Sequence, residues 1–388
     1  MNIFESIRVQ GFRRLHDVEL KLRPLNVLIG ANGSGKTSLL DVFTLLSASA
    51  AGDLKSTISD YSGVDSNLSV VAGVEGEKAR CVRFELHRQV PGSYPLKYVL
   101  SLKPGGTSYE IPDESLTQQL NVMQHVPMKH LEAVQGRVRY YDPATRNLVA
   151  PSWEYDKLES ALSQVPKMYP EPERFRRTLA SSTHYHVLDV SSRAPVRLPQ
   201  QMREAKLPGQ NGEDLAVCLY CMREADPDRF ETIEDTLRVG FPSFERLNFP
   251  PVAAGLLAIT WKERDIKHPF YMHQLSEGTL RFLWLVTLLY SPGLTDVTLL
   301  DEPEVSLHPE LLSVLAVCLR EASTRTQLIV ATHADRLVRF LQPSEVVTLD
   351  MEDGVTTATR AEDLDLEEWL KEYTLDEVWQ HGRMGGRP

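Results

Sequence analysis

A glycine-rich segment near the N-terminus, 30-GANGSGKT-37, has the residue types and spacing that bind phosphates. It follows the apolar run 25-LNVLI-29 and precedes leucines at helical spacing, so we expect it to be the turn between a buried strand and a helix. Glycines let backbone N–H groups face phosphate oxygens, and the helix N-terminus adds its dipole. In such a turn Lys36 would reach the outer phosphates, and Thr37 would offer its hydroxyl to Mg²⁺. The segment therefore predicts a site for the phosphate chain of a nucleotide.

Two adjacent carboxylates end a second apolar run, in the segment 297-VTLLDEPEVSLHP-309. The run describes a buried strand that delivers Asp301 and Glu302 at its carboxyl end, where α/β sheets bind ligands. Asp301 is placed to hold the Mg²⁺ shell, and Glu302 to orient or deprotonate an attacking water. Together with the phosphate-binding segment, the pair predicts hydrolysis of a nucleoside triphosphate.

Two shorter segments gain weight from their order along the chain. The first, 275-LSEGT-279, opens a helix shortly before the carboxylate strand, and its Ser276 and glycine suit a γ-phosphate, although alone they would indicate only an N-cap. The second, 328-LIVATHA-334, is a buried strand that ends at His333, where the imidazole could contact a γ-phosphate. Alone, a histidine at a strand end is usually a structural residue.

The elements that must position these motifs alternate between helix and strand in the C-terminal half. Such alternation implies a parallel sheet. The expected elements are helix 276–291, strand 296–300, helix 309–323, strand 327–331, helix 334–341 and strand 345–349.

The N-terminal half has a different pattern, in which short alternating segments between residues 66 and 111 predict an antiparallel meander. Short helices and proline-broken loops are expected over 113–182, and a strand over 184–190. No heptad run supports a long coiled-coil arm. The expected division is an N-terminal lobe with the phosphate turn and the meander (1–112), a mostly helical insert or lid (113–245), a C-terminal lobe (246–350) and an acidic tail with surface helices (351–388).

Composition narrows the class of protein. The 388 residues include 42 Lys plus Arg and 53 Asp plus Glu, a net charge of −11, so nucleic acid could be bound only through a local basic face. Four scattered cysteines favour a reducing, cytoplasmic location. The N-terminus has no signal-peptide pattern, and the apolar stretch 280–290 is too short to span a membrane.

The ordered set GANGSGKT, LSEGT, LLDEPE, SLHP and ATH resembles the ABC-type ATPase heads of the RecF, SMC and OLD group. The similarity is to the predicted AAA-family ATPase branch, without a coiled coil or a Toprim domain. The opening 7-IRVQGFRRLHDVEL-20 matches the first strands of the group, and 209–244 is similar to a helical segment of that branch. The resemblance is convincing over about 1–50 and 180–350 and loose between them.

The resemblance implies an α/β fold of the P-loop NTPase, ABC-ATPase type, with N-terminal antiparallel β structure, a parallel core and a helical insert. In that family two heads sandwich two ATPs, and each P-loop faces the signature motif of the other head, so a homodimer or higher oligomer is expected. The implied catalytic residues are Lys36, Glu302 and His333, and the implied Mg²⁺ ligands are Thr37 and Asp301. The implied ATP-binding residues are Arg13, Gly30, Ala31, Asn32, Gly33, Ser34, Gly35, Lys36, Thr37, Ser38, Ser276 and Gly278.

The sequence departs from transporter-type relatives at two positions. Glu277 stands where many of them have glycine, and His308 lies in a loop where they usually have Ala-Leu-Asp. The long insert and this loop argue against a transporter cassette, and retention of both Asp301 and Glu302 argues against a non-hydrolysing switch. The position of a glutamine switch loop stays open among Gln118, Gln119, Gln124 and Gln135.

Two roles for the ATPase remain open. One is DNA maintenance or repair, or anti-phage defence, with direct DNA contact; the other is a regulatory subunit that controls a separately encoded effector. Residues 167–206 carry a net charge of +4, and 137-RVRYYD-142 interleaves arginines with tyrosines, a pattern that could follow a phosphate backbone or form an ordinary solvated face.

Two further pairs of residues have the spacing of metal ligands, but little else in the sequence supports a metal site at either pair. Cys218 and Cys221 lie within an expected helix and have no second cysteine pair, which favours a structural role. His184 and His186 would share one face of a strand, but no carboxylate is adjacent to them in sequence, so we interpret them as ordinary strand residues.

Overall fold

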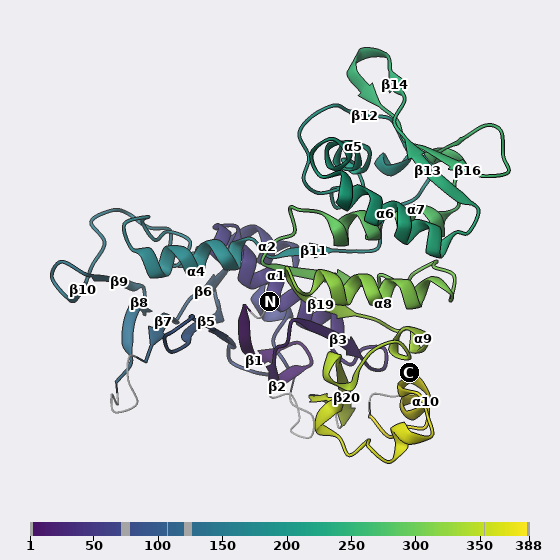
Figure 1. Ribbon diagram of the computed structural model, residues 1–388. Coiled ribbons are helices and arrows are strands. Elements are labelled where there is room, and N and C mark those ends of the chain that lie inside the picture. The colour runs from purple at the N-terminus through teal and green to yellow at the C-terminus, as the bar shows by residue number, and fades with distance from the viewer. Residues whose placement is uncertain (1–2, 71–77, 107, 120–125, 353, 386–388) are drawn as a thin grey trace.

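The computed structural model describes residues 3–70, 78–106, 108–119, 126–352 and 354–385. Two large sheets dominate it, one antiparallel and one mainly parallel, and Figure 1 shows the antiparallel sheet extending to one side of the helical part. This is the predicted combination of an antiparallel sheet and a parallel α/β core.

The antiparallel sheet has the spatial order β10-β9-β8-β7-β5-β4-β1-β2, with β6 beside β5. Residues 113–149 contribute strands to it, so the prediction of a mostly helical insert is wrong for this part of 113–245. The meander continues because apolar side chains such as Leu116 and Leu131 alternate onto its buried face. Its strands are β1 (Phe4–Phe12), β2 (Leu15–Lys21), β4 (Val82–Arg88), β5 (Leu96–Gly105), β6 (Ser108–Glu110), β7 (Asp113–Gln118), β8 (Met128–Val134), β9 (Arg137–Asp142) and β10 (Asn147–Val149).

The second sheet has the order β11-β18-β19-β3-β20-β21 and is parallel from β11 to β20. Both faces are buried, which explains the continuous apolar runs: Val27 and Ile29 of β3 enter one core, and Leu28 enters the other. The strands are β3 (Leu25–Ile29), β11 (Thr183–Tyr185), β18 (Val297–Asp301), β19 (Gln327–Ala331), β20 (Val346–Glu352) and β21 (Val355–Arg360). The strand expected at 184–190 is thus limited to three residues.

Helix α1 (Lys36–Ala51) lies between the two sheets. Its Leu39, Phe43 and Leu46 are buried in the core that also contains Leu28 of β3. The side chain of Gln327 on β19 joins the sheets, because its Oε1 accepts the N–H of Phe4 at 2.9 Å and its Nε2 donates to the carbonyl of Phe4 at 2.9 Å. Helices α2 (Leu54–Asp60), α3 (Gly63–Ser66) and α4 (Pro170–Ala180) complete this side.

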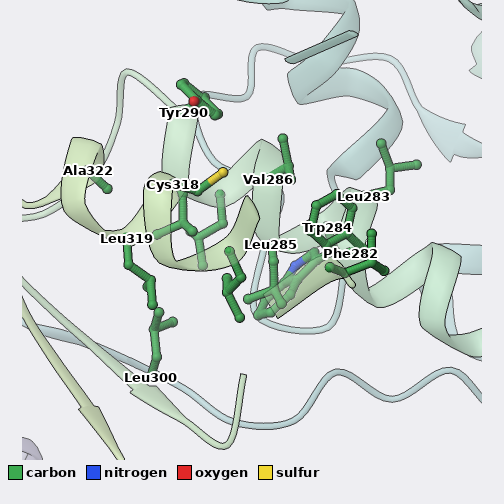
Figure 2. Packing of buried hydrophobic residues seen from close by; sticks show 14 of the residues in the cluster. Phe282, Leu283, Trp284, Leu285, Val286, Tyr290, Leu300, Cys318, Leu319 and Ala322 are labelled. Atoms are coloured by element: carbon green, nitrogen blue, oxygen red, sulfur yellow. The ribbon is translucent and has the colours of Figure 1, made fainter. Parts of the chain in front are cut away.

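Helices α7 (Glu277–Tyr290) and α8 (Leu311–Ala322) cover the other face of the parallel sheet. Figure 2 shows side chains of both helices gathered with Leu300 of β18, the residue before Asp301. Because this packing is dense and apolar, it fixes the strand that carries the two carboxylates.

A helical lobe with small sheets sits above α8 in Figure 1. The segment 209–244, similar to a helical segment of the family, forms α5 (Leu215–Ala225) and α6 (Pro227–Gly240), and the side chain of Asp226 caps α6. The strands of the lobe are β12 (Gln200–Gln201), β13 (Phe244–Asn248), β14 (Pro251–Val252), β15 (Leu256–Leu257), β16 (Thr260–Glu263) and β17 (Phe270–Tyr271).

The C-terminal region differs from the expected acidic tail of surface helices. Residues 355–360 form β21, which pairs with β20 at the sheet edge, and Thr356 donates its hydroxyl proton to the carbonyl of Ser34 at 2.9 Å. The only regular α-helix of the described part beyond residue 351 is α10 (Leu375–Gln380). The helix expected at 334–341 is shortened to α9 (Asp335–Val338).

Candidate active site

The glycine-rich turn joins β3 to α1, as the sequence predicts. Gly30 has φ +148° and Gly35 has φ +106°, values that side chains rarely tolerate. A Cβ on Gly30 would lie 2.3 Å from the carbonyl oxygen of Leu349, so only glycine fits between the turn and β20. The turn ends on the exposed Thr37 in the first turn of α1.

Lys36 folds back over this turn. Its ammonium donates to the carbonyls of Gly30 at 2.6 Å and Ala31 at 3.0 Å, and the residue is only 4% exposed. Burial lowers the pKa of Lys36 to about 8, although the negative charges of Glu302 and Asp301 act to raise it. A phosphate chain at the turn would supply the counter-charge that this buried ammonium lacks.

Asp301 and Glu302 reach the same edge of the sheet on β18. The parallel register pairs Asp301 with Ala331, and the N–H of Glu302 donates to the carbonyl of Ala331 at 2.9 Å. Burial, followed by the charge of Glu302, raises the pKa of Asp301. Glu302 has φ +49°, and this left-handed backbone turns the chain away from the strand direction directly after the metal-type carboxylate.

His333 lies beside Glu302, with 3.7 Å between Nε2 of the imidazole and Oε1 of the carboxylate. Burial and the nearby Lys36 lower the pKa of His333, while Glu302 opposes them. The structure thus brings together Lys36, Asp301, Glu302 and His333, four residues that the sequence predicted from three separate motifs.

Glu304 is a residue of this site that the sequence reasoning did not identify. Its Oε1 accepts the hydroxyl of Thr332 at 2.6 Å and the N–H of His333 at 3.1 Å, so it holds the loop that carries His333. Burial raises the pKa of Glu304, and its Oε2 has no hydrogen-bond partner among the described residues. Its position two residues after Glu302 was visible in sequence, but its partner loop was not.

The LSEGT segment forms the start of α7, where Ser276 caps the helix by accepting the N–H of Thr279 at 3.2 Å. Among the described residues, no hydrogen bond or ion pair joins Ser276 to the glycine-rich turn. A Cβ on Gly278 would lie 2.5 Å from the carbonyl oxygen of Ser306, so glycine is required where the segment packs on the SLHP loop. Arg281 strengthens this contact, because its guanidinium donates to Ser306 Oγ at 2.5 Å.

The guanidinium of Arg13 is engaged in hydrogen bonds with neighbouring side chains. Its guanidinium donates to Asp41 Oδ2 at 2.5 Å and to Asn67 Oδ1 at 2.8 Å. The adjacent Arg14 is exposed, and a Cβ on Gly33 at the crest of the turn would be 4.0 Å from Arg14 Nε. The contact between Arg13 and nucleotide stays a prediction, and Arg14 is a second arginine at the turn that the sequence did not single out.

His184 and His186 also reach this edge of the sheet. The parallel register pairs His184 with Leu299 and Tyr185 with Leu300, so the next residue along, His186, is level with Asp301. The two imidazole centroids are 4.0 Å apart, and burial, followed by the charge of His186, lowers the pKa of His184 to about 3. Their carboxylate neighbour is distant in sequence, which is why the sequence reasoning set this pair aside.

The residues that could hold ATP and Mg²⁺ fit those groups. Thr37 offers an exposed hydroxyl and Asp301 a half-buried carboxylate at one edge of the parallel sheet, and Mg²⁺ prefers such oxygen ligands. Ser34 Oγ, within the turn, is buried without a partner. The donor set and the glycine cradle are those that a triphosphate with Mg²⁺ needs.

Two of the four candidates for a glutamine switch, Gln118 and Gln135, make hydrogen bonds within the antiparallel sheet and its turns. Gln118 bonds to His130 at 3.1 Å and to the carbonyl of Tyr94 at 2.8 Å within the antiparallel sheet, and the backbone N–H of Gln135 donates to the carbonyl of Pro112 in a turn of that sheet. Gln119 lies directly after β7, and Gln124 is outside the described residues.

The cysteine pair lies on α5, as expected. Burial raises the pKa of Cys218 to about 12, and Cys221 contacts the carbonyl of Arg203 at 3.7 Å. The four cysteines are free thiols.

Residues 25–339 match the family of AAA domains described as a putative AbiEii toxin of a type IV toxin–antitoxin system. This range covers most of the chain and contains the glycine-rich turn, both carboxylates and His333. The chain belongs to this AAA family. Membership supports nucleotide binding and hydrolysis as the general activity of the AAA protein. Among curated proteins, none matches its sequence.

Solved structures similar to the AAA protein are head domains of Smc proteins. One is an Smc head bound to the C-winged helix domain of ScpA, with 14% identity, coverage of 92% of this chain and 97% of that one, and a TM-score of 0.56. Another, derived from Pyrococcus furiosus, is an Smc head with an extended coiled coil bound to the C-terminal domain of ScpA, with 13% identity, 95% and 98% coverage, and a TM-score of 0.55. A third, from Pyrococcus yayanosii, has 12% identity, 97% and 99% coverage, and a TM-score of 0.51.

At these identities the likeness concerns the fold, and it confirms the predicted P-loop fold of ABC-ATPase type and the resemblance to RecF/SMC-type heads. No helix in the described part of the AAA protein is both long enough and apolar enough to cross a membrane.

Proposed function

We propose that this AAA protein is a Mg²⁺-dependent ATPase that works as a nucleotide-driven dimer. The observation that carries the proposal is the meeting of Lys36, Asp301, Glu302 and His333 at the carboxyl edge of the parallel sheet. They come from three separate motifs, and their mutual charges are close enough to shift the pKa values of Lys36, Asp301 and His333. A structural ion-pair network would not need a glycine turn with exposed backbone beside it.

The chemistry is mostly positioning and charge neutralisation. Lys36 and the N–H groups of the turn would bind the phosphate chain, and Thr37 with Asp301 would hold Mg²⁺. When bound, Mg²⁺ neutralises charge on the outer phosphates. Glu302 would orient and deprotonate the attacking water, because it is partly exposed and lies beside His333. His333 would contact the γ-phosphate.

The dimer would complete each site with the signature motif of the partner. Ser276 is exposed and caps α7 at its own helix N-terminus, a geometry that can receive a phosphate from another subunit. The packing of Gly278 on the SLHP loop links that motif to the loop after Glu302 within one subunit. Closure of the dimer would therefore be transmitted to Asp301 and Glu302.

For the biological role, the observations favour control of a separately encoded effector over direct DNA binding. Of the eight cations in the stretch 167–206, three arginines are engaged in ion pairs: Arg174 with Glu171, Arg176 with Glu173, and Arg203 with Asp214. In the 137–142 strand, Arg139 pairs with Glu132, and Tyr140 is buried in a stack with Trp153 and Tyr169. The name of the family, a toxin–antitoxin system, also implies a second component.

The ATPase assignment is tested with Glu302→Gln and Lys36→Ala. Glu302→Gln is expected to lower the rate of phosphate release about 10²-fold or more while ATP binding remains, and Lys36→Ala should lose binding as well. The matched control is Glu231→Gln on the exposed side of α6, which should retain the wild-type rate. Turnover by Glu302→Gln at the wild-type rate would refute the assignment.

The two roles are separated by a pull-down and a DNA titration. Control of an effector predicts that a neighbouring gene product co-purifies with the chain, and that DNA neither binds at physiological salt nor stimulates ATP turnover. Salt-dependent DNA binding with stimulated turnover would instead support DNA maintenance.

A further inference from the structure

Three metal-ligating side chains gather at one point beside the phosphate turn. One ligand atom from each of His184, His186 and Asp301 lies within 4.8 Å of the other two. The grouping follows from the sheet, because β11 and β18 are parallel neighbours and residues 184 and 186 share one face of the chain. It is therefore fixed by the backbone of the core.

The hydrogen bonds of His184 leave it ready to bind a ligand. Thr44 on α1 donates its one hydroxyl proton to the carbonyl of Leu40 at 3.2 Å, so its oxygen accepts a proton from His184 Nδ1, 3.1 Å away. The proton of the neutral ring is then on Nδ1, and Nε2 carries a lone pair. That Nε2 is buried and has no hydrogen-bond partner in the part of the chain that the structure describes, and the residue is only 8% exposed.

An unpartnered buried nitrogen costs free energy unless something binds it. His186 is exposed and, among the described residues, no hydrogen bond holds its ring, so it can turn toward the same point. The ligand atoms of a tetrahedral ion with bonds of about 2.0–2.1 Å lie about 3.4 Å from one another. Rotation of the His186 side chain can shorten the present spacing of the three ligand atoms, which is within 4.8 Å, to this value. The hydroxyl of Thr44 would act as the outer partner that orients His184.

We propose that His184, His186 and Asp301 bind a divalent transition-metal ion, such as Zn²⁺, Co²⁺, Mn²⁺ or Fe²⁺. Two imidazoles and one carboxylate suit these ions, whereas Mg²⁺ takes oxygen ligands. The proposal rests on the proposed function in one respect: Asp301 would also be a ligand of the Mg²⁺ that is bound with ATP. A bound transition ion would then be coupled to ATP through this one carboxylate.

Titration of the full chain with Co²⁺, without nucleotide and without Mg²⁺, tests the metal site directly. We expect one Co²⁺ per chain with visible absorption bands of nitrogen and oxygen ligation. His186→Ala should weaken binding about 100-fold or more, and Thr44→Val about tenfold. His268→Ala, an exposed histidine in a distant loop, is the matched control and should bind like wild type.

Equal Co²⁺ affinity in wild type, His184→Ala and His186→Ala would overturn the proposal, and so would an intense near-ultraviolet band from thiolate ligation, which would assign the ion to cysteines. His186→Ala decides the question even if the buried His184 variant unfolds. Because the titration contains no ATP, its failure is separate from failure of the ATPase assignment, which is measured with Mg²⁺ alone.

Discussion

At the scale of single residues, the burial of Lys36 lowers its pKa and so is expected to make nucleotide binding depend on pH. Its pKa of about 8 means that close to half of the free protein carries a neutral amine at pH 8. Phosphates favour the charged form and raise this pKa, so ATP binding takes up protons at pH 8 and the affinity falls as the pH rises further.

Calorimetry in two buffers with different ionisation enthalpies measures this uptake. We predict about half a proton per ATP at pH 8 and almost none at pH 6.5, with Glu302→Gln used to prevent turnover. The uptake should persist in a His333→Ala background, since the lowered pKa of that imidazole keeps it neutral at pH 8. No uptake at pH 8 would show that Lys36 is already fully protonated in the free protein.

The two adjacent arginines are expected to have different roles. Arg14→Ala should raise KM for ATP about tenfold with unchanged stability, because it removes a cation at the crest of the turn. Arg13→Ala should instead lower the free energy of unfolding by about 1–3 kcal/mol, because the mostly buried Asp41 loses its arginine partner and keeps only the hydroxyl of Tyr61 among its described side-chain partners. Steady-state kinetics and urea unfolding of both variants measure this; the reverse pattern would restore Arg13 as the nucleotide contact.

The placement of three candidate site residues at one edge of the sheet could be predicted from local sequence, and their roles stay predictions. Lys36, Asp301 and Glu302 follow from a turn and a strand end, and a short window contains each pattern. Glu304, Arg14 and the His184–His186 pair were missed because their partners are Thr332, the crest of the turn and Asp301, which only tertiary structure brings near.

At the scale of elements, the buried amide of Gln327 is one of the links between the two sheets. Gln327 exchanges hydrogen bonds with both backbone groups of Phe4 and donates to the carbonyl of Arg23 at 3.1 Å. Gln327→Leu should lower the free energy of unfolding by about 2–5 kcal/mol, because it leaves the buried backbone groups of Phe4 unpaired. Urea unfolding measures the change, with the exposed Gln201→Leu as a control within about 0.5 kcal/mol of wild type. A loss no larger than in that control would mean that the sheets do not depend on this bridge.

Elements with a strong period were predicted to within a few residues, as for α7 and β18. The strands after residue 113 were missed because their apolar alternation is weak: β7 (Asp113–Gln118) contains Leu116 as its one apolar residue, so its pairing depends on neighbours already in the sheet. The acidic region after residue 351 was misread in the same way: β21 is a strand because β20 offers it an edge and Thr356 contacts the turn. Net charge does not report such pairing.

At the scale of the whole molecule, one chain contains the glycine-rich turn and the LSEGT segment, which the proposed dimer would combine in one ATP site. Among the described residues, no hydrogen bond or ion pair joins Ser276 to the turn. The glycine-rich turn and the carboxylates lie at the carboxyl edge of the parallel sheet, while Ser276 begins α7 on the side of the helical lobe (Figure 1). A C₂ dimer with each turn facing the other chain's α7 would create two equivalent sites. This composite site is the central claim of the account.

Mixing two inactive variants tests that claim most directly. Lys36→Ala removes the turn side of a site, and Ser276→Arg blocks the signature side. Alone, each should lose almost all ATPase activity. A 1:1 mixture should recover about a quarter of the wild-type rate, because half of the dimers are mixed and each of these has one intact site out of two. A mixture as inactive as its components, with exchange of subunits verified, would contradict the composite site.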